Sequence, residues 1–243
     1  MNIALKVAYT GTNYHGFQMQ PSCISVEEEL TKAVGKAVMH EVKLYYSGRT
    51  DAGVHAQGQI VNFYTDTSVE VKNMARLINY HLPDDISVLS AWEAEEEFHA
   101  RFSAKGKHYK YIVYNSFHRN PLYFNRAMHY NYEVDIDRMQ RAVNMILGEN
   151  DFKAFMGRYA VVKDTIRRID KIEVKRVGET IEFDFYGKSF LKNMVRIIVG
   201  TTLEIGRGRL PEDCLYNAMK SKERIKAGPT APGCGLYLME IFY

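Results

Sequence analysis

The spacing of hydrophobic residues changes early in the chain. Residues 3–11 (IALKVAYTG) alternate between apolar and polar positions, which is the period of a strand. Residues 25–39 (SVEEELTKAVGKAVM) then place apolar side chains three and four positions apart, as in an amphipathic helix. Ser25 and Glu28 have the spacing of a capping box at the start of that helix. The pattern therefore predicts a strand followed by a helix.

The rest of the first half continues this mixture of strands and helices. The predicted elements are strands over 42–48 and 57–65, a helix over 70–82 and a strand over 86–92. Pro83 ends the helix, because proline has no backbone N–H to donate. The order β-α-β-β-α-β is that of the split βαβ, or ferredoxin-like, arrangement. We expect residues 1–105 to form an N-terminal α+β half.

The second half repeats this theme loosely. Its predicted elements are strands over 107–115, 169–176, 180–187 and 235–243, with helices over 135–148, 190–205 and 211–220. We expect residues 106–243 to form a C-terminal α+β half. The predicted fold class is α+β, in which two ferredoxin-like or RRM-like halves form one mainly antiparallel sheet with helices on one face.

Composition limits the class of protein. The chain has 243 residues, of which 46% are hydrophobic and 25% charged, as in a globular protein. No apolar run approaches the ~20 residues that span a bilayer, and the N-terminal residues lack the apolar core of a signal peptide. The three cysteines, Cys23, Cys214 and Cys234, are too scattered for a disulfide framework or a zinc site. We expect a cytoplasmic protein.

Charge is divided unevenly between the halves. Residues 1–100 carry 7 Lys and Arg against 13 Asp and Glu, a balance of −6, whereas residues 101–243 carry 25 against 16, a balance of +9. This asymmetry fits either a solvated surface or a polyanionic partner. The 17 tyrosines and 12 phenylalanines favour RNA, because exposed rings stack on unpaired bases.

A short stretch, residues 45–59 (YYSGRTDAGVHAQGQ), holds a single carboxylate, Asp51. Three interpretations fit it. Asp51 can cap a turn in which Gly53 supplies a permissive backbone. It can bind a metal with His55, although the sequence offers no further ligand nearby. It can also be a nucleophile, because aspartate forms covalent intermediates. The stretch alone leaves all three open.

Arg196 lies within the apolar run NMVRIIVG. A guanidinium there either snorkels to water or pairs with a carboxylate, because an unpaired buried charge is costly. A nucleophilic aspartate has to stay ionised, and a neighbouring arginine favours its charged form. Pairing with Asp51 would therefore explain both residues.

Tyr109 and Tyr111 stand two residues apart in GKHYKYIVY. Residues two apart share one face of a strand, so both rings fit plain core packing. The functional alternative is a ring that stacks on a base, with a hydroxyl placed for proton transfer.

The segment GRTDAGVHAQGQIVNF closely resembles the active-site motif of the tRNA pseudouridine synthase A family. Further segments follow the order of that family: YTGTNYHGFQMQP, FHARFSAKGKHYKYIVYN, ILGENDFKAF, FLKNMVRIIVGTTLEIG and TAPGCGLYL. The resemblance runs from about residue 3 to the last strand. It implies an RNA-binding cleft on the sheet face opposite the helices, and it favours the nucleophile among the interpretations of Asp51.

The resemblance also implies residue roles. Asp51 matches the catalytic aspartate, and Tyr109 matches the tyrosine that packs on the target base and helps to remove a proton. Arg196 matches the basic partner of the aspartate. Arg49 matches the arginine that assists in flipping the nucleotide, and Leu236 lines the pocket.

The implied activity is the isomerisation of uridine to pseudouridine at nucleotides 38 to 40 of the anticodon stem-loop of tRNA, by a homodimer without cofactor or metal. Two alternatives are a paralogue that modifies another RNA and a non-catalytic RNA-binding homologue. The chain departs from the family pattern at Met19, where a basic residue is common, and over residues 155–168. Both are candidate RNA-contacting regions that bear on target choice.

Overall fold

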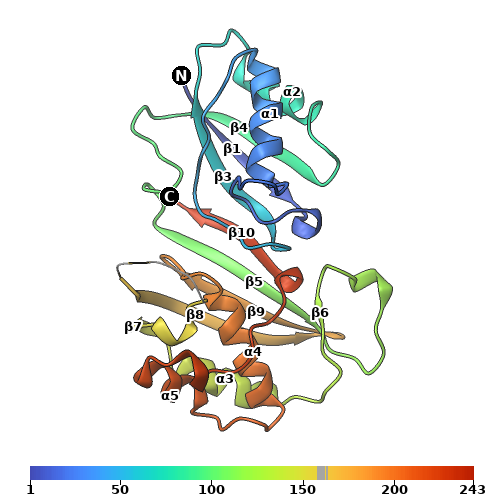
Figure 1. Cartoon of the computed structure of the whole chain (residues 1–243), viewed down its shortest axis with the longest axis vertical. Helices are drawn as coiled ribbons and strands as arrows, with labels where there is room; N and C mark the ends of the chain where they lie inside the picture. Colours follow the sequence, from blue (N-terminus) through green and yellow to red (C-terminus); the bar gives the residue numbers. More distant parts are fainter. Residues whose placement is uncertain (158–161, 163) are drawn as a thin grey trace. The chain divides into compact units, whose positions relative to one another are not determined.

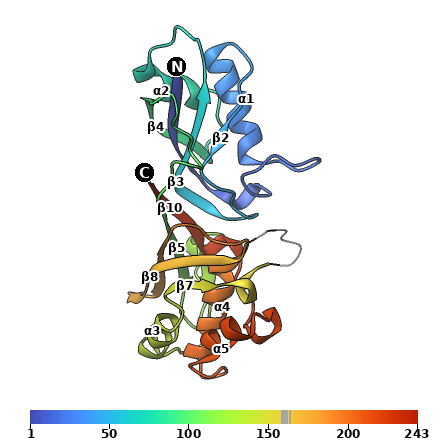
Figure 2. The same cartoon turned by 90° about the vertical axis from the view of Figure 1, so that its left-hand side faces the viewer.

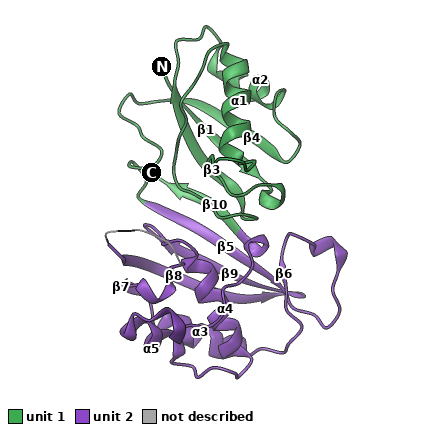
Figure 3. Ribbon diagram, viewed as in Figure 1, with its two compact units in different colours: residues 1–105, 237–243 green, residues 106–236 purple. Residues whose placement is uncertain are grey.

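The computed structural model describes residues 1–157, 162 and 164–243. The chain divides into two compact units (Figure 3). Unit 1 comprises residues 1–105 and 237–243, and unit 2 comprises residues 106–236.

The last strand explains why residues 237–243, which we expected in the C-terminal half, group with unit 1. Strand β10 (Leu236–Phe242) runs parallel to β3 (His55–Tyr64). Tyr237 pairs with His55 and Leu238 pairs with Ala56 in this register. The end of the chain thus returns to the first strands of the sequence.

Unit 1 has the strand and helix order that the pattern predicts. Its elements are β1 (Asn2–Tyr9), η1 (Gly11–Asn13), α1 (Val26–Val38), β2 (Tyr45–Tyr46), β3, α2 (Val71–Asn79) and β4 (Ile86–Ala94) (Figure 1). β1 lies between β4 and β3 and is antiparallel to both, while β2 and β10 share the other edge of β3. The order β4-β1-β3-β2 is the ferredoxin-like one. Since α1 and α2 pack against each other, they cover the same face of these strands.

Helix α1 begins as its sequence predicts. Ser25 is the N-cap residue, and its hydroxyl accepts a hydrogen bond from the Glu28 amide at 3.3 Å. The Glu28 carboxylate turns outward to pair with Lys32 at 2.7 Å, so only half of the capping box forms. The apolar stripe of Leu30 and Val34 is fully buried.

Unit 2 contains mainly antiparallel strands with helices packed on them. Its elements are β5 (Gly106–Tyr114), η2 (Pro121–Tyr123), β6 (Met128–His129), α3 (Ile136–Asn144), β7 (Gly148–Asp151), η3 (Lys153–Phe155), β8 (Ile166–Val177), β9 (Thr180–Gly187), α4 (Met194–Gly206), α5 (Cys214–Ser221), η4 (Arg224–Lys226) and η5 (Gly233–Gly235). The strands pair in the order β5-β9-β8-β7, and β6 adds to β5. α3 packs against β8 and α4, and α4 against α5, so the helices share one face (Figure 2).

Helix α4 is shorter than the helix predicted over residues 190–205. It begins at Met194, because Asn193 adopts a left-handed backbone with φ of +61° that cannot continue a helix. The Gly157 amide also donates a hydrogen bond to the Lys192 carbonyl at 2.9 Å. Arg196 therefore lies in the first helical turn and not in a helix interior.

Each unit has its own aromatic and aliphatic core. The largest fully buried side chains include Phe17 and Phe63 in unit 1, and Tyr111, Phe183 and Phe185 in unit 2. The α+β class predicted from the sequence is confirmed within the two units. Among the described residues, no helix has the length and apolar character required to cross a membrane.

Candidate active site

The Asp51 loop, residues 47–54, connects β2 to β3. Within it, the Val54 amide donates to the Asp51 carbonyl at 3.2 Å and closes a four-residue turn. Gly53 takes the third position of this turn with φ of +74°, which glycine adopts without steric cost. The turn predicted from Gly53 is confirmed. Because the turn bond uses the backbone of Asp51, the turn is compatible with a chemical role for the half-buried carboxylate.

A second segment, the η1 segment (residues 10–17), lies against the Asp51 loop. The Phe17 amide donates to the Thr50 carbonyl at 3.2 Å, and the Gly53 amide donates to the Tyr14 carbonyl at 3.4 Å. These bonds join backbone to backbone on both sides of Asp51. The YTGTNYHGFQMQP motif, which contains the η1 segment, therefore supports the loop that carries the carboxylate.

Two glycines permit this close approach. A Cβ on Gly16, whose φ is +95°, would lie 2.5 Å from the Thr50 carbonyl oxygen. A Cβ on Gly11 would overlap the Val54 carbonyl. Any side chain at either position would push the η1 segment away from the Asp51 loop.

Side chains reinforce the same arrangement. The hydroxyls of Tyr9 and Thr50 share a hydrogen bond of 2.8 Å. The Tyr14 hydroxyl donates to Asp85 at 2.5 Å and fixes the η1 segment to the loop before β4. Burial and this bond to Asp85 raise the pKa of Tyr14, so the phenol stays a donor at neutral pH.

The structure assigns His55 a role in this support. Its Nδ1 accepts a hydrogen bond from the Gly11 amide at 3.1 Å, and its ring stacks on Tyr237 with centroids 4.6 Å apart. Nδ1 is therefore engaged by the backbone. Within the part of the chain that the structure describes, no group of three or more His, Cys, Asp and Glu side chains is placed to hold a metal ion.

Tyr109 lies on β5 in unit 2, on the same strand face as Tyr111. Both rings are buried, and Tyr109 makes an edge contact with Phe190, with centroids 5.2 Å apart and planes at 81°. The Tyr111 hydroxyl donates to the Pro232 carbonyl at 2.8 Å. The Tyr111 hydroxyl is thus used in a structural hydrogen bond. Tyr109 contacts Phe190 through its ring.

Arg196 anchors a loop in unit 2. Its Nε donates to the Ala231 carbonyl at 2.8 Å, its own carbonyl accepts the Ala231 amide at 3.0 Å, and a guanidinium nitrogen donates to the Asn193 side chain at 3.3 Å. A cation in the first turn of a helix faces the positive end of the helix dipole, which is unfavourable. These contacts therefore hold Arg196 where helix electrostatics alone would not place it.

The anchored loop, residues 230–235 (TAPGCG), leads directly into β10. Two adjacent carbonyls of this loop accept hydrogen bonds from unit 2 side chains: that of Ala231 from Arg196, and that of Pro232 from the Tyr111 hydroxyl. A Cβ on Gly235 would lie 2.6 Å from the Tyr111 ring. Leu236 follows this close contact and is buried. The TAPGCGLYL motif therefore fixes Arg196 and Leu236 with respect to β5.

The structure thus assembles the predicted residues in two groups. Arg49 and Asp51 share one loop in unit 1, whereas Tyr109, Arg196 and Leu236 gather around β5 and the TAPGCG loop in unit 2. The pairing of Asp51 with Arg196 stays a prediction. Sequence reasoning missed Phe190 and Asn193 as the contacts of Tyr109 and Arg196. Both lie in the FLKNMVRIIVG segment, and the helix predicted across them obscured their role.

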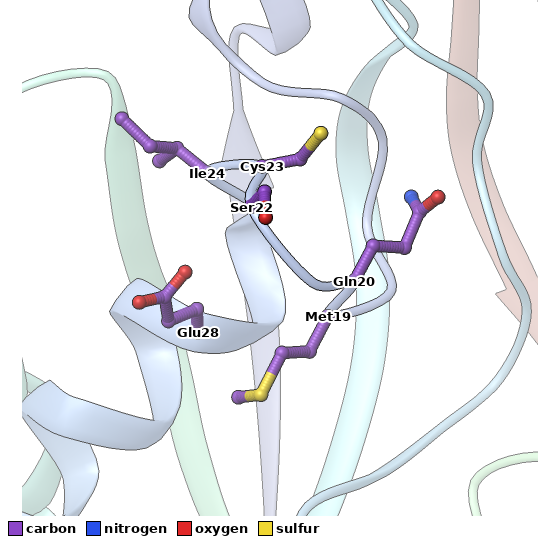
Figure 4. A pocket seen from close by; sticks show the side chains of 6 residues that line it. All are labelled: Met19, Gln20, Ser22, Cys23, Ile24 and Glu28. Atoms are coloured by element: carbon purple, nitrogen blue, oxygen red, sulfur yellow. The ribbon is translucent and has the colours of Figure 1, made fainter.

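The two departures from the family pattern have different surroundings. Met19 is half-exposed and lines a cavity of about 360 Å³, together with Gln20, Ser22, Cys23, Ile24 and Glu28 (Figure 4). None of the predicted catalytic residues lines it. The second departure, residues 155–168, is described only in part, because residues 158–161 and 163 lie outside the described residues.

A carboxylate on a fixed turn, as in unit 1, can act as a nucleophile, and a tyrosine hydroxyl, as on β5 of unit 2, can take part in acid–base chemistry. Comparison with known proteins gives that chemistry a context. The family model described as tRNA pseudouridine synthase matches residues 5–103 and 142–243. Those ranges contain Arg49, Asp51, Arg196 and Leu236, whereas Tyr109 lies between them.

Whole-length relatives fill that gap. The chain is 42% identical over 242 residues to a protein named tRNA pseudouridine synthase A from Thermoanaerobacter sp. (strain X514), covering 100% of this chain and 99% of the relative. It is 39% identical over 242 residues to a protein of the same name from Acetivibrio thermocellus, with the same two coverages.

A solved structure, titled as a crystal structure of a Cbf5-Nop10-Gar1 complex, is 14% identical and covers 83% of this chain and 54% of that chain. Its TM-score is 0.38. The chain belongs to the tRNA pseudouridine synthase family.

Proposed function

We propose that this chain is a tRNA pseudouridine synthase that isomerises uridine at nucleotides 38 to 40 of the anticodon stem-loop. The observation that carries the proposal is the position of Asp51, which lies in the GRTDAGVHA segment on a turn held by a second backbone segment. The name shared by relatives that are about 40% identical over the whole chain supports both the reaction and tRNA as substrate.

The reaction rearranges one nucleotide without a net change in atoms. The bond from C1′ to N1 breaks, the uracil rotates, and C1′ joins C5. C5 then loses its proton and N1 gains one, so no redox partner is required. Asp51 attacks C6 of the base or C1′ of the sugar, or promotes elimination across the sugar, and the proposal is compatible with each route.

The other residues take complementary roles in the proposal. Tyr109 packs on the uracil and helps to remove the proton from C5, and Leu236 lines the pocket. Arg196 supplies the positive charge that pairs with the Asp51 carboxylate. Arg49, exposed two residues before Asp51, assists in extruding the nucleotide. Extrusion costs a few kcal/mol of unstacking, which binding energy has to offset.

Binding of the substrate is assigned chiefly to the basic half. The balance of +9 over residues 101–243 favours phosphate contacts, so affinity for tRNA should fall steeply with salt. We include in the proposal a homodimer in the cytoplasm that works without cofactor or metal, with an RNA-binding cleft on the face opposite the helices.

The test is a gene deletion followed by mapping of pseudouridines in total tRNA and rRNA by carbodiimide labelling and primer extension. Loss of the modification at nucleotides 38 to 40 of tRNA is the expected result. Loss only in another RNA would identify the paralogue alternative. An unchanged map in both RNAs would favour the non-catalytic RNA-binding homologue.

A further inference from the structure

The segment that joins β5 to β6, residues 115–127, exposes large apolar side chains. Phe117 is 77% exposed, Leu122 82% and Phe124 75%. The segment extends from the strands of unit 2 as a separate lobe (Figure 3). Three large apolar side chains this exposed on one short segment mark a surface that contacts a partner, because single exposed apolar residues are ordinary but clusters are not.

This display segment, residues 115–127, is held by contacts of its own. The Asn120 side chain accepts the Leu122 amide at 3.0 Å and caps η2. The Tyr123 ring stacks on Tyr114 of β5, with centroids 4.5 Å apart and planes at 16°. Val113 pairs with Met128 where the segment rejoins the sheet. The exposed side chains are therefore presented by a fixed backbone, which lowers the conformational entropy lost on binding.

The charged residues of the display segment itself are all basic. No aspartate or glutamate occurs between Phe98 and Tyr132, a stretch that includes the whole display segment. Arg119 and Arg126 are exposed residues of the display segment, and His118 directly precedes Arg119 in the sequence. The Glu179 carboxylate lies at the base of the segment, where it accepts a hydrogen bond from the Tyr114 hydroxyl at 3.5 Å. A partner that combines negative charge with flat apolar faces fits this surface.

We infer that the display segment stacks Phe117 and Phe124 on unpaired bases of the tRNA while Arg119 contacts the adjacent phosphates. This inference rests on the proposed function and adds an RNA contact apart from the reacting uridine. Unpaired nucleotides offer π-faces beside phosphates, and aromatic and arginine side chains recognise that combination. A purely apolar protein surface would not account for the lack of aspartate and glutamate between Phe98 and Tyr132, whereas an RNA partner does.

The test separates ring stacking from general apolar contact. In the full-length protein, Phe117→Leu with Phe124→Leu keeps apolar bulk but removes both rings. Phe117→Tyr with Phe124→Tyr keeps both rings. Tyr80→Leu is the matched control, because Tyr80 is 85% exposed but lies in the acidic half. Affinity for a tRNA transcript is measured at constant salt, and pseudouridine formation by the wild type is measured on the same transcript.

The leucine pair should raise Kd for tRNA roughly tenfold, the scale of lost base stacking, whereas the tyrosine pair and Tyr80→Leu should bind like the wild type. Equal affinity of the leucine pair and wild type, with active wild type, would overturn the inference and leave the proposed function intact. A leucine pair that lowers the oligomeric state in sedimentation would overturn it in favour of a second copy of the chain. A wild type that forms no pseudouridine would remove the proposed function itself, and this inference with it.

Discussion

The Asp51 loop of unit 1 and the Tyr109–Arg196 region of unit 2 are fixed by different kinds of contact. Around Asp51 the backbone amides of Phe17 and Gly53 bond to the carbonyls of Thr50 and Tyr14. In unit 2, side chains make the decisive bonds to the backbone, as Arg196 does to the carbonyl of the TAPGCG loop at 2.8 Å.

This difference matches two demands that the proposed function makes, one on each unit. The carboxylate needs a fixed position, and glycines at close approach provide it through the main chain. In the proposed function the groups in unit 2 need particular side-chain chemistry, because the proposal gives separate roles to a ring, a hydroxyl and a guanidinium. Substitutions at Gly11 and Gly16 should therefore displace the Asp51 loop, whereas removal of single polar atoms should alter the chemistry of the unit 2 region.

The largest effect among these tests is expected from Tyr109→Phe, which keeps the ring against Phe190 and removes the hydroxyl. Turnover should fall roughly 10²-fold or more, the scale of general acid–base catalysis, while tRNA binding is retained. The matched control is Tyr111→Phe, which removes the bond to the Pro232 carbonyl and should cost about 1 kcal/mol of stability with a smaller effect on turnover. Unchanged turnover in Tyr109→Phe would reduce that tyrosine to a packing residue.

Gly16→Ala tests the backbone support of the Asp51 loop. Its Cβ would lie 2.5 Å from the Thr50 carbonyl oxygen, so the loop has to move. A displacement near 1 Å at a reacting group costs on the order of 10²-fold in rate. Gly148→Ala is the control, because Gly148 shares a positive φ, +87°, but has nothing within 4 Å of the added Cβ. If both variants lose stability and keep activity, the η1 segment does not position Asp51.

The variants Arg196→Met and Arg196→Lys distinguish the effect of the positive charge of Arg196 from the effect of its hydrogen bond to the Ala231 carbonyl. Lysine keeps the positive charge but lacks the Nε–H that bonds to Ala231. If Arg196 acts as the counter-charge of Asp51, the methionine variant should lose roughly tenfold or more in kcat/KM, by the scale of a charge-assisted bond, and lysine should recover part of it. Equal losses in the two variants would make Arg196 a loop anchor only.

The smallest effect is expected from Asp151→Asn, at a side-chain contact away from the predicted pocket. Two hydrogen bonds lower the pKa of Asp151 from 3.8 to about 2, and the bond from Lys222 contributes more than the bond from Thr165. Because the folded pKa is the lower one, this stabilisation is present above pH 3.8 and is lost as pH falls toward 2. In urea unfolding, the free energy of unfolding of the variant should be at most about 1 kcal/mol below that of the wild type at pH 7. This difference should shrink as the pH falls from 3.8 toward 2. A difference that persists at pH 2 would point to another cause.

Much of unit 1 was predictable from residue periodicity. The helix after Ser25 has a capping serine and a regular apolar stripe, so its start and buried face agree with the structure. The strand predicted over 42–48 shrinks to Tyr45–Tyr46, because the chain leaves the sheet to form the Asp51 loop. The local sequence pattern does not predict this change, because the path of the Asp51 loop depends on hydrogen bonds to the η1 segment, which is distant in the sequence.

Long-range pairing accounts for one further difference from the sequence prediction, and a local backbone conformation accounts for another. Periodicity identifies β10 as a strand but not its parallel pairing with β3, which groups the last residues with unit 1. The start of α4 was misplaced because apolar residues continue upstream of Asn193, whose backbone is left-handed. The candidate residues themselves came from the family motif, since Asp51 alone was open to three interpretations.

The central claim, that Asp51 is the catalytic aspartate, is tested most directly by Asp51→Asn in a tritium-release assay on tRNA labelled at C5 of uridine. The amide has nearly the same size as the carboxylate but is neither nucleophile nor base. The variant should keep the wild-type fold and tRNA affinity and show no release above background over many wild-type turnovers. Release within tenfold of the wild-type rate would contradict the claim.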